Sequence, residues 1–492
     1  MKRFSFLSVI AAILLFACNE IDNNGFDLAS AIDQQIVNKT HSINVTQNEA
    51  SGIADMFMRS EAGNSGVATK SADSRSKKVS SSATVREDGQ DLMYVFNYED
   101  GGFVIVGSTR NYYPILAYSD KGSFVLQDDM GPLDVWLDET KVSIKNSGSL
   151  DEATKAQMQN LWARYDGTYV DPAQQLLAAR RPQTRSAGED SCWAEIERLQ
   201  AQYGSEGWTF LPLSFVEDLF DDLGLSNDYA TICYNASQNN SALNETIIGY
   251  KNPVNFHEGP LLSTEWHPLT PFNDLCPSNC YAGYGPIAVA QVMKYYEQPS
   301  SMSWGGVTFG WSNIPAVPNY NSTDRHAYLI RYLWNKLNVH VYSPTRVLTT
   351  VNKVQSGLDS IGYTATISNP HSNSAVRNQL IYYSRPVIMY GKDNNQDISH
   401  FWVCEGVDET DYNRIIFYTK IQPNGAGQFT QGVYSHSNPG DIGGGTPSLY
   451  FYMNWGMGSS PYFDPNGWYS SNNVVLDGTN LSSDRKDVFV SW

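Results

Sequence analysis

The stretch that decides the fold class lies at residues 283–296 of this 492-residue chain and reads GYGPIAVAQVMKYY. Pro286 stands at the start of its apolar run and Pro299 follows its end, and prolines in these two places bracket a helix. Nearly every position before Lys294 is apolar, as is typical of a helix buried in the centre of a domain. The sequence therefore predicts a buried central helix over 285–296.

Short runs rich in β-branched and aromatic residues follow this helix. They predict β-strands in succession, at 386–390, 401–404, 414–418 and 450–453. A buried helix followed by an antiparallel sheet predicts the α+β class.

The N-terminal third has its own pattern of elements. Strands are predicted at 92–98, 103–106, 114–119 and 122–124, and a Glu-Asp-Gly-Gly turn makes the first two a β-hairpin. Residues 151–164 have helical composition with acids first and a base last. Few large apolar residues occur over 59–88, which predicts a loop or tether. Pro, Gln, Arg and Ser accumulate over 171–190, as in a linker.

The first residues are typical of an export signal. Met1-Lys2-Arg3 is basic, and the apolar run from Phe4 to Phe16 is too short to span a bilayer. The run ends in Leu-Phe-Ala-Cys18, which resembles a bacterial lipobox, although an ordinary signal peptide with an incidental cysteine is the alternative. We expect a signal peptide over 1–17 and a lipidated Cys18. The protein would be lipid-anchored in the bacterial cell envelope, with the outer-membrane surface and secretion as the open destinations.

The charge balance excludes one class of partner. Lys and Arg total 33 against 51 Asp and Glu, a formal net charge of -18. A protein this acidic is repelled by the phosphates of nucleic acids and does not bind them independently of sequence, so we expect no nucleic-acid partner. We also expect contact with a membrane only through the lipid.

The cysteines and histidines predict no metal site. Without Cys18, an odd number of cysteines remains, so at least one thiol is free or paired outside the chain. Cys276 and Cys280 are candidates for a local disulfide. A zinc site would need a second closely spaced ligand pair, and the eight histidines contain no HExxH pattern. We expect neither a metal nor a cofactor.

Several stretches together resemble the streptopain-like cysteine peptidases, which have the papain fold. They are 266–299, 385–387, 399–403 and 454–458, and residues 94–124 resemble the inhibitory propeptide of that family. Residues 191–260 carry no resemblance. The resemblance implies a tether over 18–44, a small α+β propeptide-like inhibitory domain over 45–165, a linker over 166–190 and a papain-like domain over 191–492. The last would be built from the buried central helix and the antiparallel sheet.

The resemblance also implies where the catalytic groups would stand. The family's nucleophilic cysteine follows a glycine and opens the central helix, but here Tyr284 follows Gly283. A phenol has a reference pKa near 10, against about 8.5 for a thiol, and cannot replace it in a pocket shaped for sulfur. The family's oxyanion-stabilising Gln comes two residues after the Trp that corresponds to Trp266, but here that position is Pro268. Losing one oxyanion donor typically costs about 2.7–4 kcal/mol of barrier.

The positions on the base side are retained. His400 corresponds to the family's catalytic base, and Asn454 and Trp455 correspond to the segment that orients it. Outside that resemblance, His400 would be read as a buried structural histidine beside aromatic residues.

Three functions from different classes follow from these residues. The first is a catalytically inactive pseudopeptidase on an envelope lipoprotein, which binds a peptide or protein ligand or caps another protease. The second is an active cysteine endopeptidase made as a zymogen, with Cys280 or another residue as nucleophile. The third is a structural or adhesive surface protein that keeps only the fold.

Overall fold

The computed structural model describes most of the chain after residue 41. The described residues are 42–64, 77–166, 187–204, 208–213, 246–251, 254–392, 399–411, 415–420, 430–435, 448–458, 463–471, 475–476, 479–480 and 485–492. The predicted signal peptide and Cys18 lie outside them. The chain divides into two compact units, and the larger contains Ile43–Asp166, Asn255–Asp411 and Pro447–Trp492. Its first part, residues 43–166, is called the N-terminal segment below.

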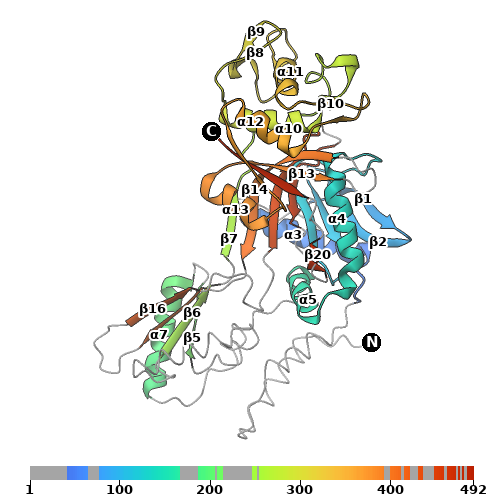
Figure 1. Cartoon of the computed structure of the whole chain (residues 1–492). Coiled ribbons are helices and arrows are strands. Elements are labelled where there is room, and N and C mark those ends of the chain that lie inside the picture. The colour runs from blue at the N-terminus through green and yellow to red at the C-terminus, as the bar shows by residue number, and fades with distance from the viewer. Residues whose placement is uncertain are drawn as a thin grey trace. The chain divides into compact units, whose positions relative to one another are not determined.

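One eleven-stranded sheet runs through the larger unit (Figure 1). In spatial order its strands are β1 (Val79–Glu87), β2 (Gln90–Tyr98), β3 (Phe103–Gly107), β4 (Ile115–Ser119), β18 (Gly467–Ser470), β17 (Ser448–Asn454), β14 (Ser399–Asp411), β13 (Val387–Lys392), β21 (Lys486–Ser491) and β12 (Thr364–Ser368), with β7 (Val254–Glu258) also paired to β14. Neighbours along the main path pair antiparallel. The β4–β18 pair joins the N-terminal segment to the rest, with Tyr118 opposite Trp468 and Ala117 opposite Tyr469.

The helices of the larger unit pack around this sheet (Figure 1). They are α3 (Gln47–Asn64), α4 (Pro132–Asn146), α5 (Glu152–Asp166), α10 (Tyr284–Tyr296), α11 (His326–Lys336), α12 (Val351–Asp359) and α13 (Asn373–Tyr383). The larger unit also contains short elements: 3-10 turns at Ser147–Ser149, Pro277–Asn279 and Trp311–Asn313, and the two-stranded pairs β8 (Met302–Trp304) with β9 (Val307–Phe309), β10 (His340–Val341) with β11 (Val347–Leu348), and β19 (Val475–Leu476) with β20 (Thr479–Asn480).

The predicted central helix is confirmed as α10, in which every residue from Gly285 to Met293 is buried. Its apolar faces form the middle of a core with α11, α12 and strands β13 and β14. The hairpin at 92–106 and the helix at 151–164 are confirmed as β2–β3 and α5. With this helix buried beside a large antiparallel sheet, the fold class is α+β, as predicted.

The predicted tether over 59–88 was wrong in part. Strand β1 occupies Val79–Glu87 and pairs along most of its length with β2, although six of its nine residues are exposed or nearly so. An edge strand of this kind lacks the large apolar residues that signal a strand in sequence, because only one position, Val85, is buried.

The described residues of the smaller unit form a four-stranded antiparallel sheet and one helix. Its strand order is β16 (Thr430–Ser435), β15 (Ile415–Lys420), β6 (Thr246–Lys251) and β5 (Trp208–Pro212), and helix α7 (Ala187–Tyr203) packs on it. The run predicted as a strand at 414–418 therefore belongs to this sheet and not to the large one. The predicted domain boundaries stay predictions. The two compact units divide the chain differently, because the larger one combines residues 43–166 with residues 255–411 and 447–492.

Two features are absent from the described residues. No described helix is both long and apolar enough to cross a membrane. Within the same residues, no group of three or more His, Cys, Asp or Glu side chains is arranged to hold a metal ion.

Candidate functional site

The start of α10 is held by a glycine that no other residue could replace without strain. Gly283 caps the helix with φ 87°, a conformation that favours glycine, and a Cβ at this position would stand 3.0 Å from Cγ1 of Val347. Its carbonyl accepts the Ile287 N–H at 3.2 Å. The next residue, Tyr284, is therefore presented in the first turn of the helix.

Tyr284 and His400 lie next to each other. Their ring centroids are 5.7 Å apart with an interplanar angle of 63°, an edge-to-face arrangement. His400 comes from β14, is 6% exposed and pairs across the ladder with Gly391 of β13. The structure thus brings together the two positions that the sequence analysis assigned to nucleophile and base.

The phenol of Tyr284 is held in its neutral form. Burial raises its pKa well above the usual value, and the nearby carboxylates of Asp129 and Asp134 raise it further. A nucleophile must be activated by a base or by a lowered pKa. Tyr284 has the opposite shift, which disfavours the phenolate at neutral pH.

Two glycines lie against the Tyr284 ring. A Cβ on Gly456, in the loop after β17, would come within 3.8 Å of the ring. A Cβ on Gly131, the N-cap of α4, would stand 2.8 Å from Cζ and closer still to the hydroxyl oxygen. The N-terminal segment therefore reaches the first turn of α10 and contacts Tyr284 directly.

Pro268 lies beside the same helix start. It is buried, and its carbonyl accepts the N–H of Ala282 at 2.8 Å. Its ring carries no donor, so this position supplies no side-chain hydrogen bond to an oxyanion. The preceding residue, His267, packs against Gly458, and burial lowers its pKa.

The amide of Asn454 is fully used within the core. Its nitrogen donates to the Thr264 carbonyl at 2.7 Å and to Glu405 at 3.1 Å. Its oxygen accepts from Gln291 at 3.2 Å and from the Gly456 N–H at 3.3 Å. An amide offers two donors and two lone pairs, so no capacity remains for orienting His400. In this structure the predicted base-orienting residue holds the strand end, the helix and the 262–266 segment together.

Trp455 packs among aromatic rings. Its ring centroid lies 5.5 Å from that of Trp402 and 4.9 Å from that of Tyr469, and its backbone N–H donates to Asn466 at 2.9 Å. Since Trp402 is two residues after His400 in β14, Trp455 supports the strand that carries the imidazole.

A buried polar network that was not predicted from the sequence lies behind the site. Gln291 of α10 accepts the backbone N–H of Trp266 at 3.2 Å and donates to Asn454, which in turn donates to Glu405. Glu405 also accepts the Leu262 N–H, is 1% exposed, and has its pKa raised to about 8 by burial. Two residues in the sequence could have predicted this network, because each is polar within an otherwise apolar element. They are the glutamine inside the central helix and the glutamate inside the strand that carries His400.

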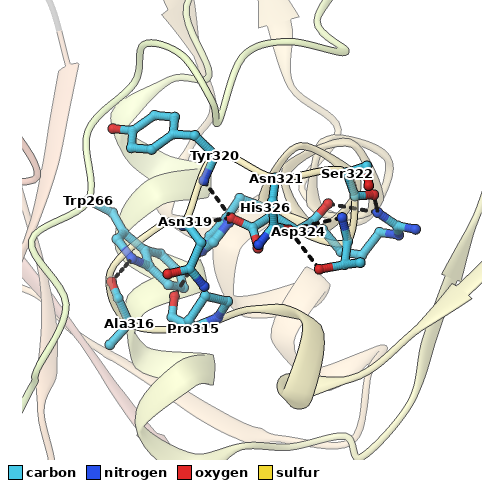
Figure 2. A network of polar contacts seen from close by, with 11 residues as sticks. Trp266, Pro315, Ala316, Asn319, Tyr320, Asn321, Ser322, Asp324 and His326 are labelled. Carbon is cyan, nitrogen blue, oxygen red and sulfur yellow. Dashed lines mark hydrogen bonds and ion pairs between the residues drawn. The ribbon is translucent and has the colours of Figure 1, made fainter.

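A second polar network fixes the loop beside Trp266 (Figure 2). The Trp266 indole donates to the Ala316 carbonyl at 2.6 Å, and His326 contacts the Pro315 carbonyl at 2.9 Å. Asp324 accepts from two successive backbone N–H groups, those of Asn319 and Tyr320, at 2.8 and 3.0 Å. Side chains within the loop therefore fix its backbone. Trp266 is held by two hydrogen bonds, one from its backbone N–H to Gln291 and one from its indole to Ala316.

The cysteines with described side chains do not offer a thiolate. Cys276, Cys280 and Cys404 are buried and free, so the candidate disulfide between the first two is not formed. Burial raises the pKa of all three thiols, that of Cys276 to about 12. Catalytic thiols need lowered pKa values, and these have the opposite shift.

Comparison with known proteins gives one family match. Residues 42–144 match the family described as Spi protease inhibitor. A search of curated proteins found no match. A fragment of prointerpain A from Prevotella intermedia is similar to this chain at 14% identity, covering 83% of this chain and 97% of the fragment, with a TM-score of 0.39. The N-terminal segment is thus similar to a protease inhibitor.

Proposed function

We propose that this protein is a peptidase-related pseudoenzyme of the streptopain-like kind, whose cleft binds polypeptide without cleaving it. The observation that carries the proposal is the neutral Tyr284 phenol, set edge-to-face against His400 where the nucleophile is expected. The match of residues 42–144 to a protease-inhibitor family supports a relationship to peptidases.

The chemistry around Tyr284 supports loss of catalysis and not a replacement mechanism. Pro268 carries no donor, and the described thiols are buried with raised pKa values. The Asn454 amide is committed to other partners. Acyl transfer would have to proceed without a thiol nucleophile at position 284 and without a side-chain oxyanion donor at position 268, and each of these groups contributes several kcal/mol in working enzymes.

Casein hydrolysis tests the proposal. The chain from Cys18 to Trp492 would be assayed as wild type, Tyr284→Cys and Cys280→Ser, before and after limited proteolysis within 171–186, with and without a thiol alkylator. We expect no alkylator-sensitive hydrolysis by the wild type in either form. The Tyr284→Cys variant regains the thiol next to His400, and we expect it to gain activity after proteolysis.

The alternative is an active zymogen, and the retained His400 and the inhibitor-like segment favour it over a purely structural protein. Alkylator-sensitive hydrolysis by the wild type would establish this alternative. Loss of that activity in Cys280→Ser would identify the nucleophile.

We also propose that the protein is exported and anchored by lipid at Cys18, on the strength of the basic start and the lipobox-like run. Metabolic labelling with a fatty acid tests this, with Cys18→Ala as the unlabelled control. Labelling of both forms or of neither would contradict the proposal.

A further inference from the structure

Helix α4 of the N-terminal segment is a core element and not a surface plug. It contacts β2 of its own segment and also β13 and β14. Ten of its fifteen residues are buried: Pro132, Leu133, Val135, Trp136, Leu137, Asp138, Glu139, Thr140, Ser143 and Ile144. A helix that is buried on most of its surface sits between two layers. Separating this helix from the large sheet would expose it to water.

Specific contacts tie α4 to the C-terminal strands. Trp136 is fully buried, its indole donates to the Ser470 carbonyl at 3.1 Å, and its ring lies 4.8 Å from Tyr469. Glu139 forms a two-point ion pair with Arg485, at 3.0 and 2.5 Å, with both side chains buried. A buried pair of this kind is costly to break, because each charge then lacks its partner.

The sheet and its core are also shared between the N-terminal segment and the rest of the larger unit. Beyond the β4–β18 ladder, the Tyr450 hydroxyl donates to the Ile115 carbonyl at 2.9 Å. One hydrophobic cluster combines side chains of the N-terminal segment, such as Phe57 and Tyr118, with Tyr450 and Trp468. The two parts therefore have a common core.

The contact between Gly131 and Tyr284 joins the N-terminal segment to the candidate site itself. Gly131 has φ 54° and leaves no room for a Cβ, because the Tyr284 phenol fills that space. A cysteine side chain is shorter by a whole ring and could not reach Gly131. Tyr284, which stands where the nucleophilic cysteine is expected, therefore makes a contact with Gly131 that a cysteine could not make.

We infer that the polypeptide bound at the Tyr284–His400 site is the chain's own N-terminal segment, held there permanently, with Tyr284 as its docking residue. This inference rests on the proposed function, since a working peptidase must clear that site. The protein would act with the segment in place, as one folded body.

A cleavable form of the full chain tests the inference. A recognition sequence for a site-specific protease would be inserted between Gln175 and Leu176, in the predicted linker, and cut in the folded protein. Dissociation of residues 18–175 would then be followed after dilution by size exclusion. We expect the wild-type fragments to stay together without denaturant, and Tyr284→Cys to speed dissociation by about tenfold, which corresponds to about 1.4 kcal/mol.

Gly131→Ala and Gly89→Ala form a matched pair of controls. Both glycines have positive φ, at 54° and 79°, but a Cβ on Gly89 meets nothing within 4 Å. Gly131→Ala should speed dissociation more than Gly89→Ala, and the excess should disappear in the Tyr284→Cys background, where the phenol is absent.

The outcomes separate the two ideas. Wild-type fragments that part on dilution, or equal effects of the two glycine variants, overturn the inference while leaving the lack of catalysis untouched. Casein hydrolysis by the cut wild type overturns the proposed function itself. Where Gly131→Ala fails to fold by circular dichroism, the comparison of wild type with Tyr284→Cys still decides.

Discussion

The Tyr284 ring stands edge-on to the imidazole of His400, with 5.7 Å between the ring centroids. The space in front of the imidazole is therefore filled by an aromatic ring that stays neutral at physiological pH. Under the proposed function, this ring gives the imidazole no nucleophile to activate. In the structure the pair is a packing contact between the first turn of α10 and strand β14.

Packing at Tyr284 should be visible in stability. We expect Tyr284→Ala to lower the free energy of unfolding by about 3 kcal/mol, because truncating a packed aromatic ring leaves a cavity. Tyr284→Phe keeps the ring and should cost less than about 1.5 kcal/mol. Urea denaturation measures both, and Tyr342→Ala, at a side chain that is 63% exposed, is the control with an expected change within about 0.5 kcal/mol. Equal effects at 284 and 342 would show that the ring is not packed.

The Glu139–Arg485 pair should carry a large coupling energy. Replacing one partner, as in Arg485→Met, leaves a buried unpaired charge and should cost about 3–5 kcal/mol. Glu139→Gln combined with Arg485→Met should cost less than the sum of the single changes, since neither charge is then left alone. The exposed pair Lys78–Glu99 is the control, with an expected coupling below about 1 kcal/mol. Additive effects at the buried pair would mean that the two charges act independently.

The sequence predicted the elements of the fold well wherever a buried apolar run ends in a clear helix or turn signal. Helix α10 was visible because it is apolar on every face between two prolines, and β2–β3 because a Gly-Gly turn separates two apolar runs. Strand β1 was missed because it lies at the sheet edge with its side chains in water. The partner of β15 could not be predicted, since pairing with β6 joins residues far apart in the chain and leaves no local signal.

The candidate site was predicted in position but not in its connections. The resemblance to the streptopain-like peptidases implied that Tyr284 and His400 share one site, and the two rings lie next to each other in the structure. The role expected for Asn454 depended on which of several neighbours its amide would meet, and three-dimensional packing decided this. The contact of Gly131 with Tyr284 had no sequence signal, because it joins a helix N-cap to a residue in another part of the chain.

Thiol reactivity gives a direct check of the cysteine environment. Since burial raises the pKa of Cys276, Cys280 and Cys404, we expect iodoacetamide at pH 7.5 to label them far more slowly in the folded protein than in urea. Peptide mapping by mass spectrometry would follow each site separately. Rapid labelling of Cys280 in the folded state would contradict its burial and would support the active-zymogen alternative.

Glu405 should make stability depend on pH in a defined direction. Burial raises its pKa from 4.5 to about 8 in the folded protein, while the unfolded chain keeps the ordinary value. Between these values the folded state binds one more proton than the unfolded state. Stability should therefore fall as pH rises through this window, by up to about 1.4 kcal/mol per pH unit, and level off above about pH 8.

Glu405→Gln removes the titrating group and should flatten this slope, which denaturation at several pH values between 5 and 8 would measure. Near pH 4.5 the variant should be the less stable of the two, because its NH₂ group cannot accept one of the two N–H bonds that the carboxyl oxygens accept from Leu262 and Asn454. The difference in the free energy of unfolding should shrink or reverse as pH approaches 8. Only the wild type has a carboxyl group that must take up a proton on folding at that pH, and this proton uptake lowers its stability. Glu152→Gln, at a highly exposed carboxylate, is the matched control and should leave the slope unchanged. A slope that persists in Glu405→Gln would assign the pH dependence to other buried carboxyls, such as Asp464, whose pKa burial raises to about 6.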